Sequence, residues 1–243
     1  MLTNKKNIDI FNDIAKTYDR INHYLSLNID KYWRNKALAK HIDKSTAKVL
    51  DIACGTGDFA INAAQLGANN IIGIDLSTKM LDIAKEKIKK KNLDNIIHVQ
   101  EGDCNSLDFD DNTFDIATIA FGVRNFENLD KSLNEVLRVL KDGGKIIILE
   151  FTSPRNKVFK RMYNFYIKNI LPSIGRLISG NKGAYIYLPT SIGEFLQYEE
   201  FTRYLKRIGF KNVYYKSLTA GIASVYYGEV LKMKLLKISN FNF

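Results

Sequence analysis

A glycine-rich turn follows the first apolar run of the chain and reads Asp51-Ile52-Ala53-Cys54-Gly55-Thr56-Gly57-Asp58. Val49 and Leu50 precede it, and residues 59–64, rich in alanine, predict a helix after it. A strand, such a turn and a helix N-terminus together form a cofactor cradle, because glycine lets the backbone bend tightly and approach a ligand. Gly55 and Gly57 are therefore candidate cofactor-binding residues.

Three acidic residues follow three successive predicted strands. Asp75 lies eighteen residues after Gly57, where it could accept hydrogen bonds from ribose hydroxyls. Asp103 could accept a hydrogen bond from an adenine amino group. Asp51 would repel a pyrophosphate, whereas S-adenosylmethionine carries a sulfonium and an ammonium, so the acids favour S-adenosylmethionine. An NAD-linked reductase is the alternative, since Gly55-x-Gly57-x-x-Ala60 also fits the looser dinucleotide fingerprint.

Strands and helices are expected to alternate after N-terminal helices within residues 7–40. The predicted elements are strand 48–52, helix 57–66, strand 70–75, helix 77–91, strand 96–101, strand 114–120, helix 128–140, strand 144–151, helix 193–208 and strands 211–217 and 220–230. This order predicts an α/β fold with a mostly parallel, doubly wound sheet that binds ligands beyond its carboxyl ends. The closing hairpin resembles the Rossmann-like class I methyltransferase fold, which has seven strands and an antiparallel last strand.

The composition fits one globular domain, with 243 residues of which 46% are hydrophobic. We divide it into an N-terminal helical lid (1–45), a cofactor-binding core (46–151), a basic aromatic insert (152–192), a C-terminal helix and hairpin (193–230) and a tail (231–243). We expect no signal peptide, no membrane span and a cytoplasmic location. Cys54 and Cys104 are interpreted as small side chains in a reducing compartment. The three histidines lack metal-ligand spacing, so no metal is expected.

The net charge of +10 is concentrated in the insert. Residues 151–193 contain no acidic residue and seven basic ones: Arg155, Lys157, Lys160, Arg161, Lys168, Arg176 and Lys182. Interleaved aromatic and apolar residues make this composition typical of a membrane-surface element. A cap over the active site with a solvated basic face is an alternative. Nucleic-acid binding is disfavoured, because the basic residues cluster on an apolar insert rather than around the predicted crevice.

Further blocks resemble the ubiquinone/menaquinone biosynthesis C-methyltransferase family. They are Tyr18-Asp19-x-x-Asn22 with Trp33, Phe121-Gly122-Val123-Arg124-Asn125-Phe126, residues 138–144 with Glu150, residues 185–192, and residues 219–224. Together they span nearly the whole chain. The resemblance implies that Thr56 and Asp75 contact S-adenosylmethionine, and that Asp103 and Cys104 hold its adenine edge. It also implies methylation of a ring carbon of a reduced prenylated quinone.

Such a carbon becomes nucleophilic when the neighbouring hydroxyl ionises, and phenols ionise near pH ~10. A nearby cation favours the ionised form. We expect Arg124 in this role, Asn125 as a hydrogen-bonding partner, and Tyr18 or a water as proton relay. The alternative is that Arg124 pairs with Asp19 or another acid and holds the N-terminal segment in place.

Demethylmenaquinol is the expected substrate, because Ala120 stands where some ubiquinone-type members have serine. A ubiquinone precursor, another small phenol, a sterol and RNA are the alternatives. The expected partners are the prenylated quinol, the inner face of the membrane, to which the enzyme would bind peripherally, and a second copy of the chain in a homodimer. No nucleic-acid partner is expected.

Overall fold

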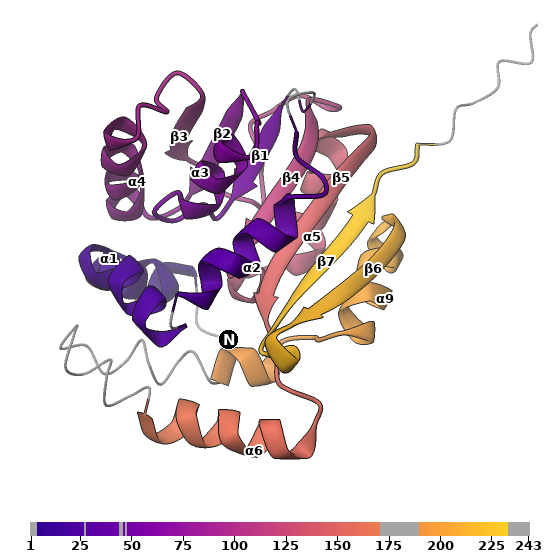
Figure 1. Ribbon diagram of the computed structural model, residues 1–243. Helices are drawn as coiled ribbons and strands as arrows, with labels where there is room; N and C mark the ends of the chain where they lie inside the picture. Colours follow the sequence, from indigo (N-terminus) through magenta and orange to yellow (C-terminus); the bar gives the residue numbers. More distant parts are fainter. Residues whose placement is uncertain (1–3, 27, 44–45, 47, 171–189, 233–243) are drawn as a thin grey trace, which may run out of the picture.

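A seven-stranded sheet forms the centre of the computed structural model, which describes residues 4–26, 28–43, 46, 48–170 and 190–232 (Figure 1). The strands are β1 (Val49–Ile52), β2 (Ile71–Asp75), β3 (Ile97–Glu101), β4 (Phe114–Ala120), β5 (Leu140–Phe151), β6 (Lys211–Leu218) and β7 (Ala223–Glu229). Their order is β3-β2-β1-β4-β5-β7-β6. The first five pair in parallel, and β7 pairs antiparallel with β5 and β6. The predicted sheet is therefore confirmed.

Helices cover both faces of the sheet, because the parallel strands are apolar on both sides. On one face lie α2 (Ile29–Leu38), α3 (Asp58–Gln65) and α4 (Thr78–Lys90), packed with a buried cluster that includes Trp33, Phe59 and Ile88. On the other lie α5 (Leu129–Val139) and α9 (Glu199–Ile208), packed with a second cluster. The result is a three-layer sandwich.

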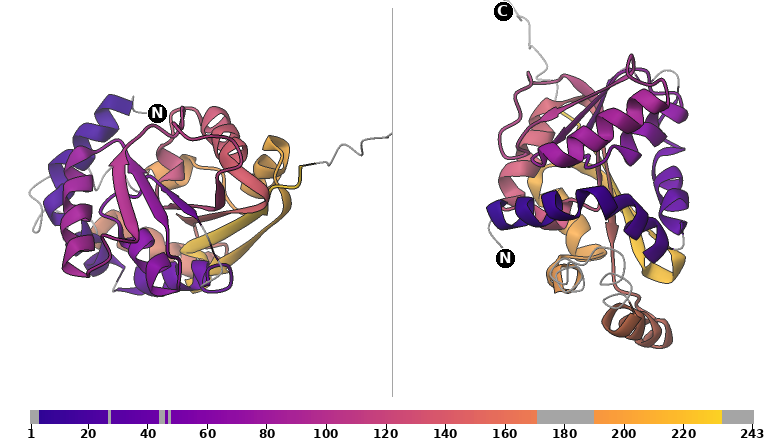
Figure 2. Two further views of the ribbon diagram at one scale, coloured as in Figure 1. Left: turned by 90° about the horizontal axis from the view of Figure 1, so that it is seen from above. Right: turned by 90° about the vertical axis from the view of Figure 1, so that its left-hand side faces the viewer.

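The carboxyl ends of the parallel strands face two further helices, α1 (Asn4–Leu25) and α6 (Lys157–Phe165) (Figure 1). In the right-hand view of Figure 2, α6 lies farther from the sheet than α1. The chain order reverses between β1 and β4, and in sheets of this kind a ligand crevice forms outside such a switch point. The fold therefore predicts a ligand site between β1, β4 and α1.

One predicted helix differs from the structure. Residues 190–194 are helical, residues 195–198 are not, and α9 begins only at Glu199, so a single helix over 193–208 was wrong. Tyr198 has a φ of 54°, which a helix does not accommodate, and its N–H donates to the hydroxyl of Tyr226 at 2.8 Å. The other predicted elements agree within a few residues. Much of the predicted insert (171–189) lies outside the described residues.

Candidate active site

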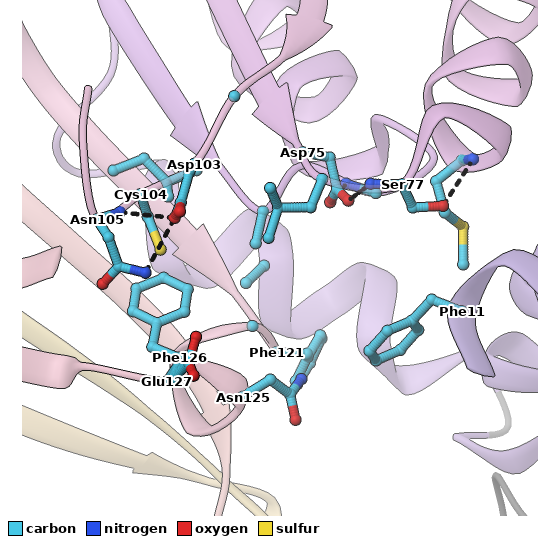
Figure 3. Close-up of a pocket in the computed structure, with 18 of the residues that line it drawn as sticks. Phe11, Asp75, Ser77, Asp103, Cys104, Asn105, Phe121, Asn125, Phe126 and Glu127 are labelled. Carbon is cyan, nitrogen blue, oxygen red and sulfur yellow. Dashed lines mark hydrogen bonds between the residues drawn. The ribbon is translucent and has the colours of Figure 1, made fainter. Parts of the chain in front are cut away.

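A cavity of about 820 Å3, part of it open to solvent, lies at the carboxyl ends of β1 to β4 (Figure 3). Its wall is formed by the segments that follow these strands, together with Phe11 and Tyr18 of α1. The cavity therefore stands where the topology predicts a ligand.

The backbone at this edge adopts conformations that suit a close-approaching ligand. Gly55 has a φ of +55°, and a Cβ at this position would meet no atom within 4 Å, so the loop faces open space. Ala53 and Phe121, at the ends of β1 and β4, also have positive φ values of 53° and 58°. Such strain in residues other than glycine is concentrated at functional sites. Gly57 has another role, because its Cβ would lie 3.3 Å from that of Ala84, so its lack of a side chain lets α3 and α4 pack closely.

Asp75 presents its carboxylate to the cavity at the end of β2. Its Oδ2 accepts a hydrogen bond from the Gly55 N–H and its Oδ1 one from the Ser77 N–H, each at 2.8 Å. Burial raises the pKa of Asp75, and these hydrogen bonds act against that rise. Each oxygen retains a lone pair for a second donor, so the fixed carboxylate can accept from a vicinal diol.

The segment after β3 contributes Asp103, Cys104 and Asn105, which lie together on one side of the cavity (Figure 3). Asp103 Oδ1 accepts from the Asn105 backbone N–H at 2.8 Å and from its side-chain amide at 3.0 Å. Burial raises the pKa of the Cys104 thiol to about 11, and its sulfur lies 3.3 Å from the Ser132 hydroxyl. Burial likewise raises the pKa of Cys54. Neither cysteine is therefore a thiolate nucleophile at neutral pH.

Asp51 lies behind the cavity wall rather than in it. It is 1% exposed, and its Oδ1 accepts from the Thr118 hydroxyl at 2.7 Å. Burial raises its pKa to about 7, although the Thr118 hydrogen bond and Arg34 lower it. Asp51 thus supports the end of β1 from behind the cavity wall.

A polar network ties α1 to the glycine loop. Thr56 is buried, and its hydroxyl donates to Asp19 Oδ1. Lys87 of α4 donates to Asp19 Oδ2 at 2.6 Å and also pairs with Asp58, the first residue of α3. The Thr56 side chain therefore faces α1 in this structure and does not line the cavity.

Arg124 forms a buried ion pair with Glu150. Its Nη1 lies 2.6 Å from Glu150 Oε1 and 2.6 Å from the Phe121 carbonyl oxygen, and its Nε donates to the Ser191 hydroxyl at 3.3 Å. Its acidic partner is Glu150 at the end of β5, not Asp19. Arg124 does not line the cavity, but it acts electrostatically on Tyr18, which does.

Tyr18 and Asn125 both lie in the cavity wall. Burial raises the pKa of Tyr18, while Arg124, Arg34 and a hydrogen bond with Asn22 act against that rise. Tyr18 is therefore a neutral phenol at physiological pH, and can donate a hydrogen bond.

The structure thus brings six of the predicted site residues to one cavity: Tyr18, Gly55, Asp75, Asp103, Cys104 and Asn125. The other four, Asp51, Thr56, Gly57 and Arg124, lie behind the wall. Sequence reasoning missed Phe11, Met80, Asn105, Phe126 and Glu127, which also line it. Asn105 and Glu127 come after the predicted strands 96–101 and 114–120, and Phe126 closes the Phe121–Phe126 block, but no site role was assigned to them. Nothing in the sequence singled out Phe11 or Met80 as lining residues.

The wall fits a nucleoside with a charged tail better than a metal. It offers carboxylates after β2 and β3, apolar rings, and a glycine loop at which a Cβ would project into open space. Among the residues that the structure describes, no three His, Cys, Asp or Glu side chains come together as metal ligands. These observations fit S-adenosylmethionine.

Comparisons with known proteins agree with this site. The chain is 44% identical over 218 residues to the demethylmenaquinone methyltransferase of Bacteroides fragilis, covering 89% of each chain. It is 41% identical to the ubiquinone/menaquinone biosynthesis C-methyltransferase UbiE of Geobacter sulfurreducens, covering 91% of this chain and 87% of that protein.

Among solved structures, a SAM-dependent methyltransferase from Thermotoga maritima has the same fold, with a TM-score of 0.63 at 20% identity over 91% of this chain and 98% of that one. The model of the ubiE/COQ5 methyltransferase family matches residues 1–230. The chain therefore belongs to the ubiE/COQ5 methyltransferase family.

Proposed function

We propose that this methyltransferase transfers the methyl group of S-adenosylmethionine to a ring carbon of demethylmenaquinol, giving menaquinol. The observation that carries the proposal is the likeness to a demethylmenaquinone methyltransferase over 89% of each chain. Ala120, which lines the cavity and lacks a hydroxyl, supports the menaquinone substrate over the ubiquinone precursor.

The strand ends suggest how the cofactor is held. Asp75 would accept hydrogen bonds from the ribose hydroxyls, because both its oxygens are fixed by backbone N–H groups at 2.8 Å. Asp103 and Cys104 would bind the adenine edge, and Gly55 would let the methionine half approach the backbone. Bound in this way, S-adenosylmethionine supplies an electrophilic methyl group at the switch point of the sheet.

The reacting ring would lie beside Tyr18 of α1 and Asn125, which follows β4, two polar residues that line the cavity. Tyr18, as a neutral phenol, and the Asn125 amide can donate hydrogen bonds to a quinolate oxygen. Arg124 would add its positive charge from behind. Because the site would hold the ring carbon close to the methyl group and in line with the bond that breaks, proximity would account for much of the rate enhancement.

The test is methyl transfer from labelled S-adenosylmethionine in detergent. We expect label in reduced demethylmenaquinone and none in its oxidised form, because only the quinol carries an ionisable hydroxyl beside the carbon. If the methyl group were transferred to a ubiquinone precursor but not to demethylmenaquinol, the ubiquinone precursor would replace demethylmenaquinol as the proposed substrate. Transfer to neither, with the cofactor bound, would leave the methyltransferase without the quinone substrate proposed here.

We further propose that α6 binds the membrane surface, where a prenylated quinol resides. None of its residues is buried, and four apolar side chains on one side are more than half exposed: Val158 67%, Phe159 51%, Met162 63% and Phe165 61%. Lys157, Lys160 and Arg161 are exposed on the same helix. An exposed apolar stripe with basic neighbours is the pattern of an interfacial helix. No helix among the described residues is long and apolar enough to cross a bilayer.

Residues of α6 and of the segment after it that are less exposed support the idea that the membrane-binding helix lies close to the site. Ile167, in the turn that follows α6, is 7% exposed. Tyr163 of α6 is close enough to Arg124 and Glu150 for their charges to act on its pKa, which burial raises. A quinol ring near Arg124 would thus lie close to the helix that contacts the lipid. The homodimer expected from the sequence stays a prediction, which mass photometry of the purified enzyme would test.

A further inference from the structure

Arg34 of α2 is a mostly buried cation beside the cavity. Its side chain is 12% exposed, and its guanidinium carbon lies 5.2 Å from the ring centre of Phe121, which lines the cavity. Its Nε is buried without a hydrogen-bond partner. The nearest acidic atom, Asp30 Oδ2, is 3.6 Å away. A buried donor left unpaired costs about 1–3 kcal/mol, so Arg34 Nε retains the capacity to donate to a further acceptor. Asp51 Oδ2 is likewise buried and unpaired, and the charge of Arg34 acts on Asp51.

The acid nearest to Arg34 is already occupied. Asp30 Oδ1 accepts from the Ser26 hydroxyl at 2.6 Å, and Asp30 Oδ2 lies 2.9 Å from His23 Nδ1. Within the described part of the chain, the guanidinium of Arg34 donates no hydrogen bond and makes only this long ion pair and the contact with Phe121. Its donors are therefore available to a ligand.

The other two cations near the glycine loop are engaged. Arg124 contacts Glu150, a carbonyl oxygen and a hydroxyl. Lys87 pairs with both Asp19 and Asp58. Among the described residues around this part of the cavity, Arg34 thus has the donor capacity that an incoming anion needs.

Arg34 lies near the end of β4, where it packs against Phe121, and its charge acts on three groups in that region. It opposes the rise that burial causes in the pKa of Tyr18 and of Asp51. Burial also raises the pKa of Asp58, but Lys87 and Arg34 bring it below its ordinary value. All three lie near the ends of β1 and β4, whereas Asp103 follows β3, which is two strands from β1. Neighbouring strands are about 4.8 Å apart, so two strand spacings separate the β1 end of the cavity from the β3 end. This span is roughly the distance between the nucleoside and the amino-acid tail of S-adenosylmethionine.

We propose that Arg34 binds the carboxylate of the methionine half of S-adenosylmethionine. The inference rests on the cofactor given in the proposed function, and adds the residue that recognises its anionic group. A guanidinium matches a carboxylate in shape and charge and can donate two parallel hydrogen bonds to it. Arg34 lies against Phe121 rather than in the wall, so the contact requires rotation of its flexible side chain. The competing explanation is that Arg34 only balances the charges of Asp30, Asp51 and Asp58.

Isothermal titration calorimetry separates these two roles. S-adenosylmethionine and decarboxylated S-adenosylmethionine, which lacks only the carboxylate, would each be titrated into the wild type, Arg34→Gln, Arg34→Lys and Lys36→Gln. Lys36 is exposed on the same helix, so its substitution removes an equal charge away from the cavity. Circular dichroism melts would confirm that each variant is folded.

We expect Arg34→Gln to weaken binding of S-adenosylmethionine about 10- to 100-fold, as for loss of a charged hydrogen-bonded pair. Binding of the decarboxylated ligand should change by less than about threefold, because it has no group for Arg34 to hold. Arg34→Lys should give an intermediate loss of affinity for S-adenosylmethionine, since lysine keeps the positive charge but cannot donate two parallel hydrogen bonds to one carboxylate. Lys36→Gln should change neither affinity.

Equal weakening of both ligands in Arg34→Gln would show a structural role and overturn the proposal. Unchanged binding of both would also overturn it. Failure of the wild type to bind either ligand would instead remove the proposed cofactor, which is a different failure.

Discussion

Removing the apolar surface of α6 should detach the enzyme from lipid without unfolding it. In the variant Phe159→Ser/Phe165→Ser, two rings that are 51% and 61% exposed are lost. The exposed area of the two rings together corresponds to about one whole Phe side chain, whose transfer from water is worth about 1.5–3 kcal/mol. Partitioning into vesicles should therefore fall about 10- to 150-fold.

Flotation with vesicles containing anionic phospholipid measures this partitioning. A matched control is Tyr32→Ser/Leu231→Ser, which removes side chains that are 53% and 52% exposed on other parts of the surface. The control should bind lipid as the wild type does. Salt should weaken lipid binding by the wild type and by the control, because the basic residues of α6 contribute about 1 kcal/mol each near an anionic surface. Equal partitioning of the α6 variant and the control would refute the reasoning.

Kinetic measurements distinguish a loss of membrane binding from a loss of the methyl-transfer step itself. With a short-tailed quinol dissolved in detergent, the α6 variant should retain the wild-type kcat, because its two altered side chains are exposed. With long-tailed quinol in vesicles, its rate should fall in proportion to the lost partitioning. A fall of equal size in detergent would indicate that α6 acts on the reaction itself.

Three further predictions concern the site. Burial raises the pKa of Asp51 to about 7, above its value of 3.8 in an unfolded chain. The wild type should therefore lose about 3 kcal/mol of stability relative to Asp51→Asn as the pH rises from 4 to 7, as measured by urea unfolding at each pH. In Gly122→Ala the new Cβ would lie 2.8 Å from the Ala53 Cβ, so calorimetry should show weaker cofactor binding and urea unfolding a loss of about 1–3 kcal/mol. In Gly193→Ala the new Cβ of a helical residue faces open space, so cofactor binding should stay unchanged and no stability should be lost. Glu150→Gln leaves the buried Arg124 without its counter-charge and should lower the free energy of unfolding by about 3–5 kcal/mol, and a loss below about 1 kcal/mol would contradict the ion pair as described.

The strand ends were predictable because their signals are local. A glycine turn after an apolar run, with acids at fixed positions after the next runs, specifies the parallel sheet and its ligand edge without knowledge of distant contacts. The N-cap of α4 is a local signal of the same kind, because a serine just before a helix is a preferred cap, and the Ser77 hydroxyl accepts from the Met80 N–H at 3.2 Å. The break before α9 was not predictable, because it depends on Tyr198 donating its N–H to Tyr226, which is far along the chain.

The partners of the charged residues also required the fold. Sequence reasoning proposed Asp19 or another acid for Arg124, and the structure selects Glu150, which is 26 residues away and completely buried. Asp19 instead accepts from Thr56 and Lys87. Long side chains choose their partners by three-dimensional proximity, and no spacing rule along the chain predicts those pairs.

The Arg124–Glu150 pair changes what can activate the substrate. Because Glu150 lies 2.6 Å from the guanidinium and compensates its charge, Arg124 cannot by itself lower the pKa of a quinol hydroxyl as far as an unpaired cation would. Tyr18 cannot serve as a ready-made base either, since burial raises its pKa and keeps it protonated near neutral pH. In the proposed reaction, what remains is stabilisation of the quinolate by hydrogen bonds from Tyr18 and Asn125, with the charge of Arg124, partly compensated by Glu150, behind them. The quinol proton would leave to water, or through Tyr18 if that phenol passes on its own proton as it accepts one. The site would then favour the ionised quinol by stabilising it rather than by removing its proton.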